Sequence, residues 1–202
     1  MSVSGFEIEP VGLGRARLVR GPRFGDDRGS FSVIANHDLY AALGMQTDYL
    51  QQNQSLSRDS GTVRGLHYQT PPHDQAKLVR VVRGRILDVI VDARVGSRTH
   101  GEHRAIMLDG KSRDQLFVPR GFLHGFMTLE PDTVVAYTVD NRYAPEAEFS
   151  IAWNDPELAI DWPGTEAGPT LSDKDAAGLP WSSVGETFRS LAPADVAGGE
   201  QA

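Results

Sequence analysis

The stretch KLVRVVRGRILDVIVDARVG, from Lys77 to Gly96, indicates the fold class of this chain. It holds two short runs rich in Val, Ile and Leu that meet after Gly84. Branched apolar residues favour extended backbone, and glycine marks the turn between two such runs. The stretch therefore predicts two successive β-strands.

Further runs of the same kind follow toward the C-terminus: HRAIMLDG, QLFVPRG, FLHGFMTLE and TVVAYTVDNRY. Turn signals recur at intervals of roughly 8 to 12 residues, which is typical of a sandwich or barrel. Because helices are not interleaved with these strands, a jelly roll of two sheets is favoured over a parallel α/β sheet. The predicted fold class is all-β.

A few short helices complete the prediction. Asn36 can cap HDLYAALG, which ends at Gly44 as helices commonly do. A second short helix is expected near Ser172, in SDKDAAG.

Length and composition indicate one folded domain. The chain has 202 residues, of which 40% are hydrophobic and 23% are charged, so wholesale disorder, a coiled coil and collagen are excluded. We expect a single domain over residues 1–185 and a C-terminal tail over 186–202, whose last stretch, APADVAGGEQA, is small, polar and prone to fray.

Charge and cysteine content narrow the function classes. There are 20 Lys and Arg against 27 Asp and Glu, a net charge of −7 that argues against a nucleic-acid partner. The absence of cysteine excludes disulfides, zinc-thiolate sites, iron–sulfur clusters and thiol nucleophiles. No signal-peptide pattern and no apolar run of about 18 residues occurs, so we expect a cytoplasmic protein with no membrane partner.

The densest polar cluster comes just before the Lys77–Gly96 stretch, in QQNQS, RGLHYQ and PPHDQAK. Polar side chains beside apolar strands commonly line a cavity. Arg64 offers a forked anion binder, His67 a base that titrates near neutrality, and Lys77 an ammonium that can stabilise an oxyanion. On adjacent strands facing one way, His67 and Lys77 could serve one carbonyl compound. The alternative is a hydrogen-bonded structural histidine and a solvated lysine.

Other candidates flank this cluster. Tyr137 and Tyr143 are six residues apart, which on a regular strand places both on one face, either as acid and stacking group or as core aromatics. Asp175 could orient a histidine or simply begin a helix. Asp88 and Asp92 are rival partners for His67 or Lys77.

The stretch PRGFLH, from Pro119 to His124, has the Pro-x-Gly-x-x-His spacing of the second signature motif of the cupin superfamily. Many cupins bind metal through histidines and would require a His-x-His pair followed by Glu in the preceding motif. Here Tyr68 and Gln69 follow His67, so the ligand set is incomplete and no metal is predicted.

Taken together, the motifs resemble one family. FGDDRG from Phe24, QxNxS, RGLHYQ, QAKLVR, DVIVDAR, PxGFxHGF, WNDP and LSxKD up to Asp175 stand in the order of the dTDP-4-dehydrorhamnose 3,5-epimerase family. The resemblance implies a cupin-type jelly roll, a homodimer that shares strands across its interface, and catalysis without metal or organic cofactor. The implied function is epimerisation at C3, C5 or both of a nucleotide-linked 4-keto-6-deoxyhexose, with dTDP as the expected nucleotide.

The resemblance also implies a role for each matching residue. His67 corresponds to the base, Asp175 to the carboxylate that orients it, Lys77 to the enolate stabiliser and Tyr137 to the general acid. Substrate binding is implied for Arg28, Phe31, Gln51, Asn53, Arg64, His124 and Tyr143, the last by stacking on the nucleobase.

Two positions depart from the family pattern. Val33 stands where a nucleotide-side glutamate is common, and Arg142 stands where many members have a tyrosine. Because valine accepts no hydrogen bond, the sugar and the base stay open. Two alternatives are kept: a catalytically silent nucleotide-sugar binding protein, and a metal-dependent cupin enzyme.

Overall fold

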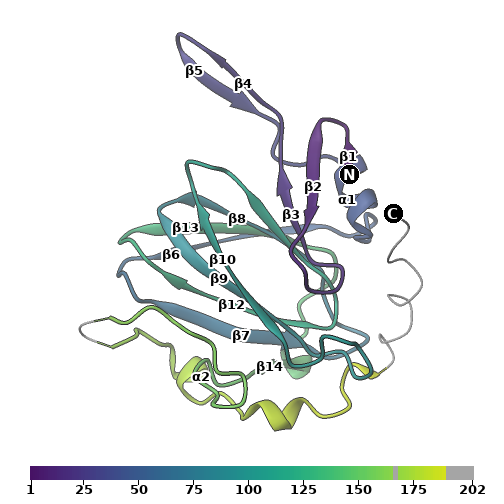
Figure 1. The fold of residues 1–202 in the computed structure, drawn as a ribbon, viewed down its shortest axis with the longest axis vertical. Helices are drawn as coiled ribbons and strands as arrows, with labels where there is room; N and C mark the ends of the chain where they lie inside the picture. The colour runs from purple at the N-terminus through teal and green to yellow at the C-terminus, as the bar shows by residue number, and fades with distance from the viewer. Residues whose placement is uncertain (166–167, 190–202) are drawn as a thin grey trace.

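The computed structural model describes residues 1–165 and 168–189, in which two antiparallel sheets face each other (Figure 1). The larger sheet has the order β1 (Ser2–Val3), β2 (Phe6–Pro10), β3 (Arg17–Arg20), β11 (Gln115–Val118), β8 (Lys77–Arg83), β13 (Thr133–Val139), β6 (Gln51–Ser57). The smaller has the order β10 (His103–Asp109), β9 (Arg85–Asp92), β12 (Phe122–Thr128), β7 (Val63–Gln69), β14 (Glu148–Ser150). The all-β prediction is confirmed.

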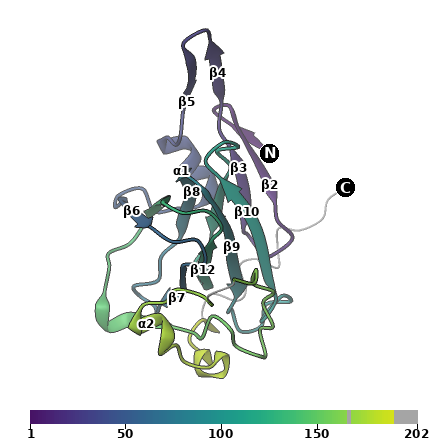
Figure 2. The same cartoon turned by 90° about the vertical axis from the view of Figure 1, so that its left-hand side faces the viewer.

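A separate hairpin of β4 (Arg23–Asp26) and β5 (Gly29–Ser32) stands away from both sheets. Figures 1 and 2 show it projecting beyond the body of the molecule in both views. Every residue of β4 is exposed, and β5 is held to its own chain by hydrogen bonds from Arg113 to Ser32 Oγ at 2.7 Å and to Ser30 Oγ at 3.2 Å.

The two strands that meet at Gly84 belong to different sheets, β8 to the larger and β9 to the smaller. The chain therefore crosses between the layers at Gly84, whose φ of 84° lies in the left-handed region. A Cβ at this position would lie 2.3 Å from Thr133 Oγ1, so glycine is required. His67 and Lys77 are consequently on facing sheets rather than on adjacent strands, because β7 and β8 are also in different layers.

The main core fills the space between the two sheets. Ile86, Ile90 and Phe126 of the smaller sheet pack with Val79 and Val135 of the larger one. Side chains alternate between the two faces of a strand, and this places the apolar side chains above inward. Polar side chains on the same inner face, His67 among them, therefore also point between the sheets.

A second core covers the outer face of the smaller sheet. Leu66, Val89 and Leu123 are buried there by the C-terminal segment, including Ile151 and Phe188. Phe188 lies in the segment predicted as a tail, and residues 190–202 of that tail lie outside the described residues. Figure 2 shows this segment, with α2, wrapped beneath the sheets.

Both predicted helices are confirmed. Helix α1 spans His37–Leu43, with Asn36 accepting from the Leu39 N–H at 2.9 Å and Gly44 ending it at φ 76°. Helix α2 spans Asp173–Ala176 and is capped by Ser172. The single-turn helices η1 and η2 span Pro145–Ala147 and Trp181–Val184.

Strands β7 and β12 approach unusually closely beside His67. A Cβ on Gly65 would lie 2.5 Å from the Cα of Gly125, and the φ of Gly65 is 124°. The register between the strands shifts here, between His124 and Phe126. Two facing glycines therefore allow the approach that sets the position of His67.

Candidate active site

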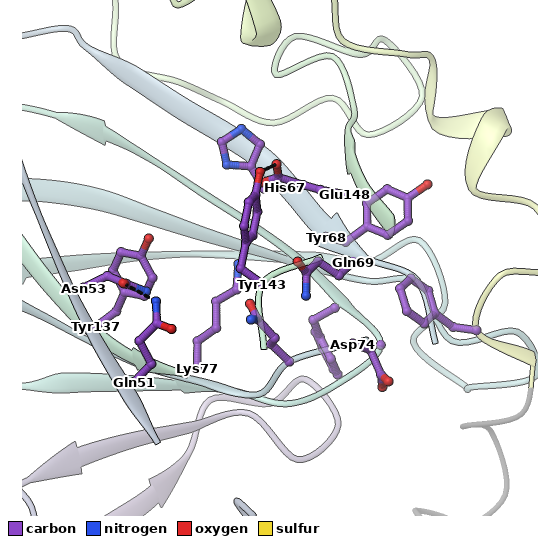
Figure 3. Close-up of a pocket in the computed structure, with 14 residues that line it drawn as sticks. Gln51, Asn53, His67, Tyr68, Gln69, Asp74, Lys77, Tyr137, Tyr143 and Glu148 are labelled. Atoms are coloured by element: carbon purple, nitrogen blue, oxygen red, sulfur yellow. Dashed lines mark hydrogen bonds between the residues drawn. The ribbon is translucent and has the colours of Figure 1, made fainter. Parts of the chain in front are cut away.

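A cavity of about 320 Å³ opens between the two sheets. It is lined by Gln51, Asn53, His67, Tyr68, Gln69, Asp74, Gln75, Lys77, Gly121, Phe122, Tyr137, Tyr143, Glu148 and Phe188 (Figure 3). Six of the residues singled out from sequence are among them: His67, Lys77, Tyr137, Gln51, Asn53 and Tyr143. The fold thus gathers into one cavity six predicted residues that span 92 positions of sequence, from Gln51 to Tyr143.

His67 is held from behind by Asp175. Its Nε2 lies 2.5 Å from Asp175 Oδ1, and Asp175 is only 4% exposed. Ser172 Oγ donates to the other carboxylate oxygen at 2.7 Å. Burial by itself raises the pKa of Asp175, but the hydrogen bonds from His67 and Ser172 hold this pKa below its usual value. The carboxylate is therefore ionised and ready to support a positive charge on His67.

Lys77 lies on the opposite sheet, with its side chain in the same cavity. Burial lowers the pKa of its ammonium to about 8, although the charges of Glu148 and Asp88 oppose that shift. Lys77 therefore remains cationic at neutral pH, in a site where a nearby negative charge is poorly screened.

The rival carboxylates have other partners. Asp88 is fully buried and its Oδ1 lies 2.8 Å from His124 Nε2, while Asp92 pairs with Arg94 at 2.9 Å. Neither pairs with His67. Asp88 acts on Lys77 only through its charge. His124, which was predicted to line the cavity, lies beside Asp88 and is 7% exposed.

Tyr137 reaches the cavity from β13, where it stands directly opposite Asn53 of β6. Burial is the largest cause that raises the pKa of its phenol, so Tyr137 is protonated at neutral pH. Tyr143 comes after β13 has ended, yet it lines the same cavity and is 56% exposed at its mouth.

Sequence reasoning missed Glu148. It lies on β14, opposite Gln69 of β7, and its Oε2 accepts from Tyr143 Oη at 2.7 Å and pairs with Lys174 Nζ at 2.5 Å. Burial would raise the pKa of Glu148, but Lys174 and Tyr143 keep it low, so the group is an anion. A three-residue strand carries no periodic signal, so only the pairing with β7 places Glu148 here.

Four predicted binding residues do not line this cavity: His124, beside Asp88, and three others. Arg28 lies at the tip of the projecting hairpin with a side chain 90% exposed, paired with Asp26 at 2.6 Å. Phe31, 67% exposed, stacks on Phe24 within the same hairpin. Arg64 donates to Ser57 Oγ at 3.2 Å and to the carbonyl of Leu56, although its charge still acts on Tyr137.

No group of three or more His, Cys, Asp or Glu side chains that could hold a metal ion occurs within residues 1–165 and 168–189. In the same part of the chain, no helix is long and apolar enough to cross a membrane.

Comparison with known proteins identifies the arrangement. The family model described as dTDP-4-dehydrorhamnose 3,5-epimerase matches residues 12–183. The epimerase of that name from Sinorhizobium fredii is 41% identical over 170 residues, 84% of this chain and 87% of that protein. The crystal structure of the Bacillus anthracis epimerase, with TDP and PPi bound, superposes with a TM-score of 0.82 at 42% identity, over 87% of this chain and 99% of that one.

A relative with a narrower reaction has the same fold. The 3'-monoepimerase of Streptomyces bikiniensis, solved with dTDP-quinovose, gives a TM-score of 0.82 at 30% identity, over 91% of this chain and 94% of that one. These similarities confirm the expected cupin-type jelly roll.

Proposed function

Because the chain belongs to the dTDP-4-dehydrorhamnose 3,5-epimerase family, we propose that its chemistry is carried out by His67, Asp175, Lys77 and Tyr137. The protein is an isomerase of dTDP-linked 4-keto-6-deoxyhexoses in deoxysugar biosynthesis. The observation that supports this most directly is the placement of His67 and Tyr137 on opposite sheets around one cavity. A sugar ring bound between them has a base at one face and an acid at the other.

The first step is removal of a proton. The C4 carbonyl acidifies the C–H bonds at C3 and C5, and His67 takes one of these protons. The imidazolium that forms is stabilised by Asp175, 2.5 Å away. The electron pair of the C–H bond moves into the enolate, whose oxygen is stabilised by the ammonium of Lys77.

The second step returns a proton to the opposite face. Tyr137 donates from the other sheet, so the new C–H bond has inverted configuration. A second centre is inverted when the base and acid also reach it, as in a 3,5-epimerase, whereas a monoepimerase performs the cycle once.

The substrate is held by its nucleotide. Gln51, Asn53 and Tyr143 line the cavity and are proposed to bind the substrate, with Tyr143 stacking on the base from the exposed mouth. Arg64 and His124 do not line the cavity but are also proposed to bind the substrate. Bound TDP and dTDP-quinovose in the related crystal structures support a dTDP-sugar ligand.

A homodimer is proposed to complete the site. The hairpin of β4 and β5 projects from its own subunit with Arg28 and Phe31 exposed. We assign both residues to the cavity of a partner subunit, where the guanidinium would bind the diphosphate. We propose that this enzyme acts in the cytoplasm.

Incubation with dTDP-4-keto-6-deoxyglucose in deuterated water, followed by NMR of C3 and C5, tests this function. We expect deuterium at both centres, or at one for a monoepimerase, and none with His67→Ala, which should still bind dTDP. His37→Ala, on the exposed face of α1, serves as the matched control. The absence of any incorporation in the wild-type protein would contradict the proposal and favour a silent binding protein.

A further inference from the structure

A chain of side-chain hydrogen bonds runs along β6 toward Tyr137. Tyr49 Oη donates to Gln51 Oε1 at 2.8 Å, and Gln51 Nε2 donates to Asn53 Oδ1 at 2.8 Å. Figure 3 shows the second of these bonds beside Tyr137. Gln51 and Asn53 are two positions apart on one strand, so their side chains share the face that lines the cavity.

The chain has a fixed direction. A carboxamide has one acceptor oxygen and one donor nitrogen. The Tyr49 hydroxyl donates its hydrogen bond to the oxygen of the Gln51 carboxamide. Once Gln51 Oε1 accepts from Tyr49, its Nε2 is the end that meets Asn53. Asn53 then accepts this hydrogen bond with its Oδ1. Its NH2 group stays available to donate a hydrogen bond to another neighbour.

That neighbour is Tyr137. Asn53 and Tyr137 are direct cross-strand partners in the antiparallel pair of β6 and β13, where side chains lie side by side. Burial and the charge of Glu148 raise the pKa of the Tyr137 phenol, whereas the charge of Arg64 and the hydrogen bond with Asn53 lower it. A donor to the phenol oxygen has this effect because it stabilises the phenolate.

Tyr49 is held in place from outside the cavity. The guanidinium of Arg142 lies 4.7 Å from the centre of its ring, a cation–π contact between the segments that flank β6 and β13. Tyr49 is not one of the residues that line the cavity. Its hydroxyl therefore influences the reaction only through Gln51 and Asn53.

We propose that Tyr49 and Gln51 are positioning residues, which hold the Asn53 amide with its NH2 toward Tyr137 so that the Tyr137 proton points at the sugar. This inference rests on the proposed role of Tyr137 as the acid. In the donation step the O–H bond of Tyr137 breaks and a C–H bond forms with the electron pair of the enolate. The remaining phenolate is stabilised by the Asn53 N–H and regains a proton from solvent, while the His67 imidazolium gives its proton to solvent.

If the amide were reversed, Asn53 would present its oxygen to Tyr137. The phenol would then donate to Asn53 rather than to the substrate. Proton removal by His67 would continue, but His67 would return a solvent proton to the original face. Loss of this relay, the hydrogen bonds from Tyr49 through Gln51 to Asn53, should thus allow hydrogen exchange without inversion.

The test compares Tyr49→Phe with Tyr40→Phe. Both variants lose one hydroxyl, but Tyr40 bonds Thr138 at 3.2 Å and lies outside the cavity, so it is the matched control. For Tyr49→Phe we expect inversion to fall about fivefold to tenfold while deuterium exchange and dTDP affinity stay within about twofold of wild type. Tyr40→Phe should keep the wild-type ratio of exchange to inversion.

A second variant, Gln51→Glu, keeps the size of the side chain but leaves it no donor. The substituted carboxylate can only accept from Asn53, so the amide should turn and present its oxygen to Tyr137. We expect a rise in the ratio of exchange to inversion at least as large as that of Tyr49→Phe.

An unchanged ratio in both variants, or an equal loss of exchange and inversion, would overturn the relay. Failure of the proposed function is a different result, because the wild-type protein would then show neither exchange nor inversion.

Discussion

The Nε2 atom of His67 lies 2.5 Å from Oδ1 of Asp175, across 108 residues of sequence. The contact exists because the segment after β14 returns over the smaller sheet and sets α2 against β7. Ser172 caps α2 and donates to the same carboxylate, so the helix cap also fixes the aspartate. One short helix thereby determines the orientation of the proposed base.

We expect Asp175→Asn to reduce kcat by about 100-fold to 1,000-fold with little change in KM, because the amide cannot stabilise the imidazolium. Steady-state kinetics of epimerisation checks this. Asp173→Asn removes an exposed carboxylate of the same helix and should retain wild-type kcat. Equal effects of the two substitutions would show that the Asp175 charge has no special role.

Tyr137→Phe should exchange deuterium at the carbon next to the carbonyl but fail to complete inversion. The phenyl ring keeps the packing of β13 and loses only the proton that would be delivered. Product analysis by NMR in deuterated water separates the two events. Normal epimerisation by this variant would place the acid elsewhere.

Activity should fall as the pH rises through about 8, the value to which burial lowers the pKa of Lys77. The working form is the ammonium, so enolate stabilisation is present below this pH and lost above it. Glu148→Gln removes a negative charge that raises this pKa and should move the alkaline limb of kcat/KM to lower pH by about half a unit. Glu146→Gln, an exposed carboxylate near Tyr143, should leave the limb in place. If the alkaline limb of the kcat/KM profile lay at the same pH in wild type and in Glu148→Gln, the titration of Lys77 would not be its cause.

Mixed dimers test whether Arg28 serves the partner subunit. In a dimer of Arg28→Ala and His67→Ala subunits, one cavity has both defects and the other has an intact His67 and an intact hairpin. At low substrate concentration we expect about half of wild-type activity per mixed dimer. Dimers that mix His67→Ala with Asp175→Asn should show no such recovery, because both residues act within one cavity. No recovery in the first mixture would mean that Arg28 acts on its own chain.

Gly65→Ala should destabilise the fold by about 3 kcal/mol, or roughly 6 to 12 °C in Tm for a chain of this size. Its Cβ would lie 2.5 Å from the Gly125 Cα at a φ of 124°, so β7 and β12 would be forced apart. Gly164→Ala is the control, because no atom lies within 4 Å of its added Cβ. Thermal unfolding followed by circular dichroism measures both, and equal Tm values would contradict the close approach.

Local features were predictable because they depend on neighbours in sequence. The helix between Asn36 and Gly44 follows from an N-cap acceptor and a left-handed C-cap, both of which the structure contains. The strands around Gly84 follow from runs of branched apolar residues, but the sheet to which each belongs does not.

The sequence by itself determined the all-β class and, through the order of its motifs, the family and most of the polar residues that line the cavity. The family resemblance implied Asp175 as the partner of His67, and the structure contains that contact, whereas Asp88 lies against His124 instead. Tertiary structure alone brought Glu148 into the cavity and left Arg28 on a projecting hairpin. The physical reason is that strand and helix propensities act over a few residues, whereas a carboxylate's partner depends on which sheet faces which and how the chain returns.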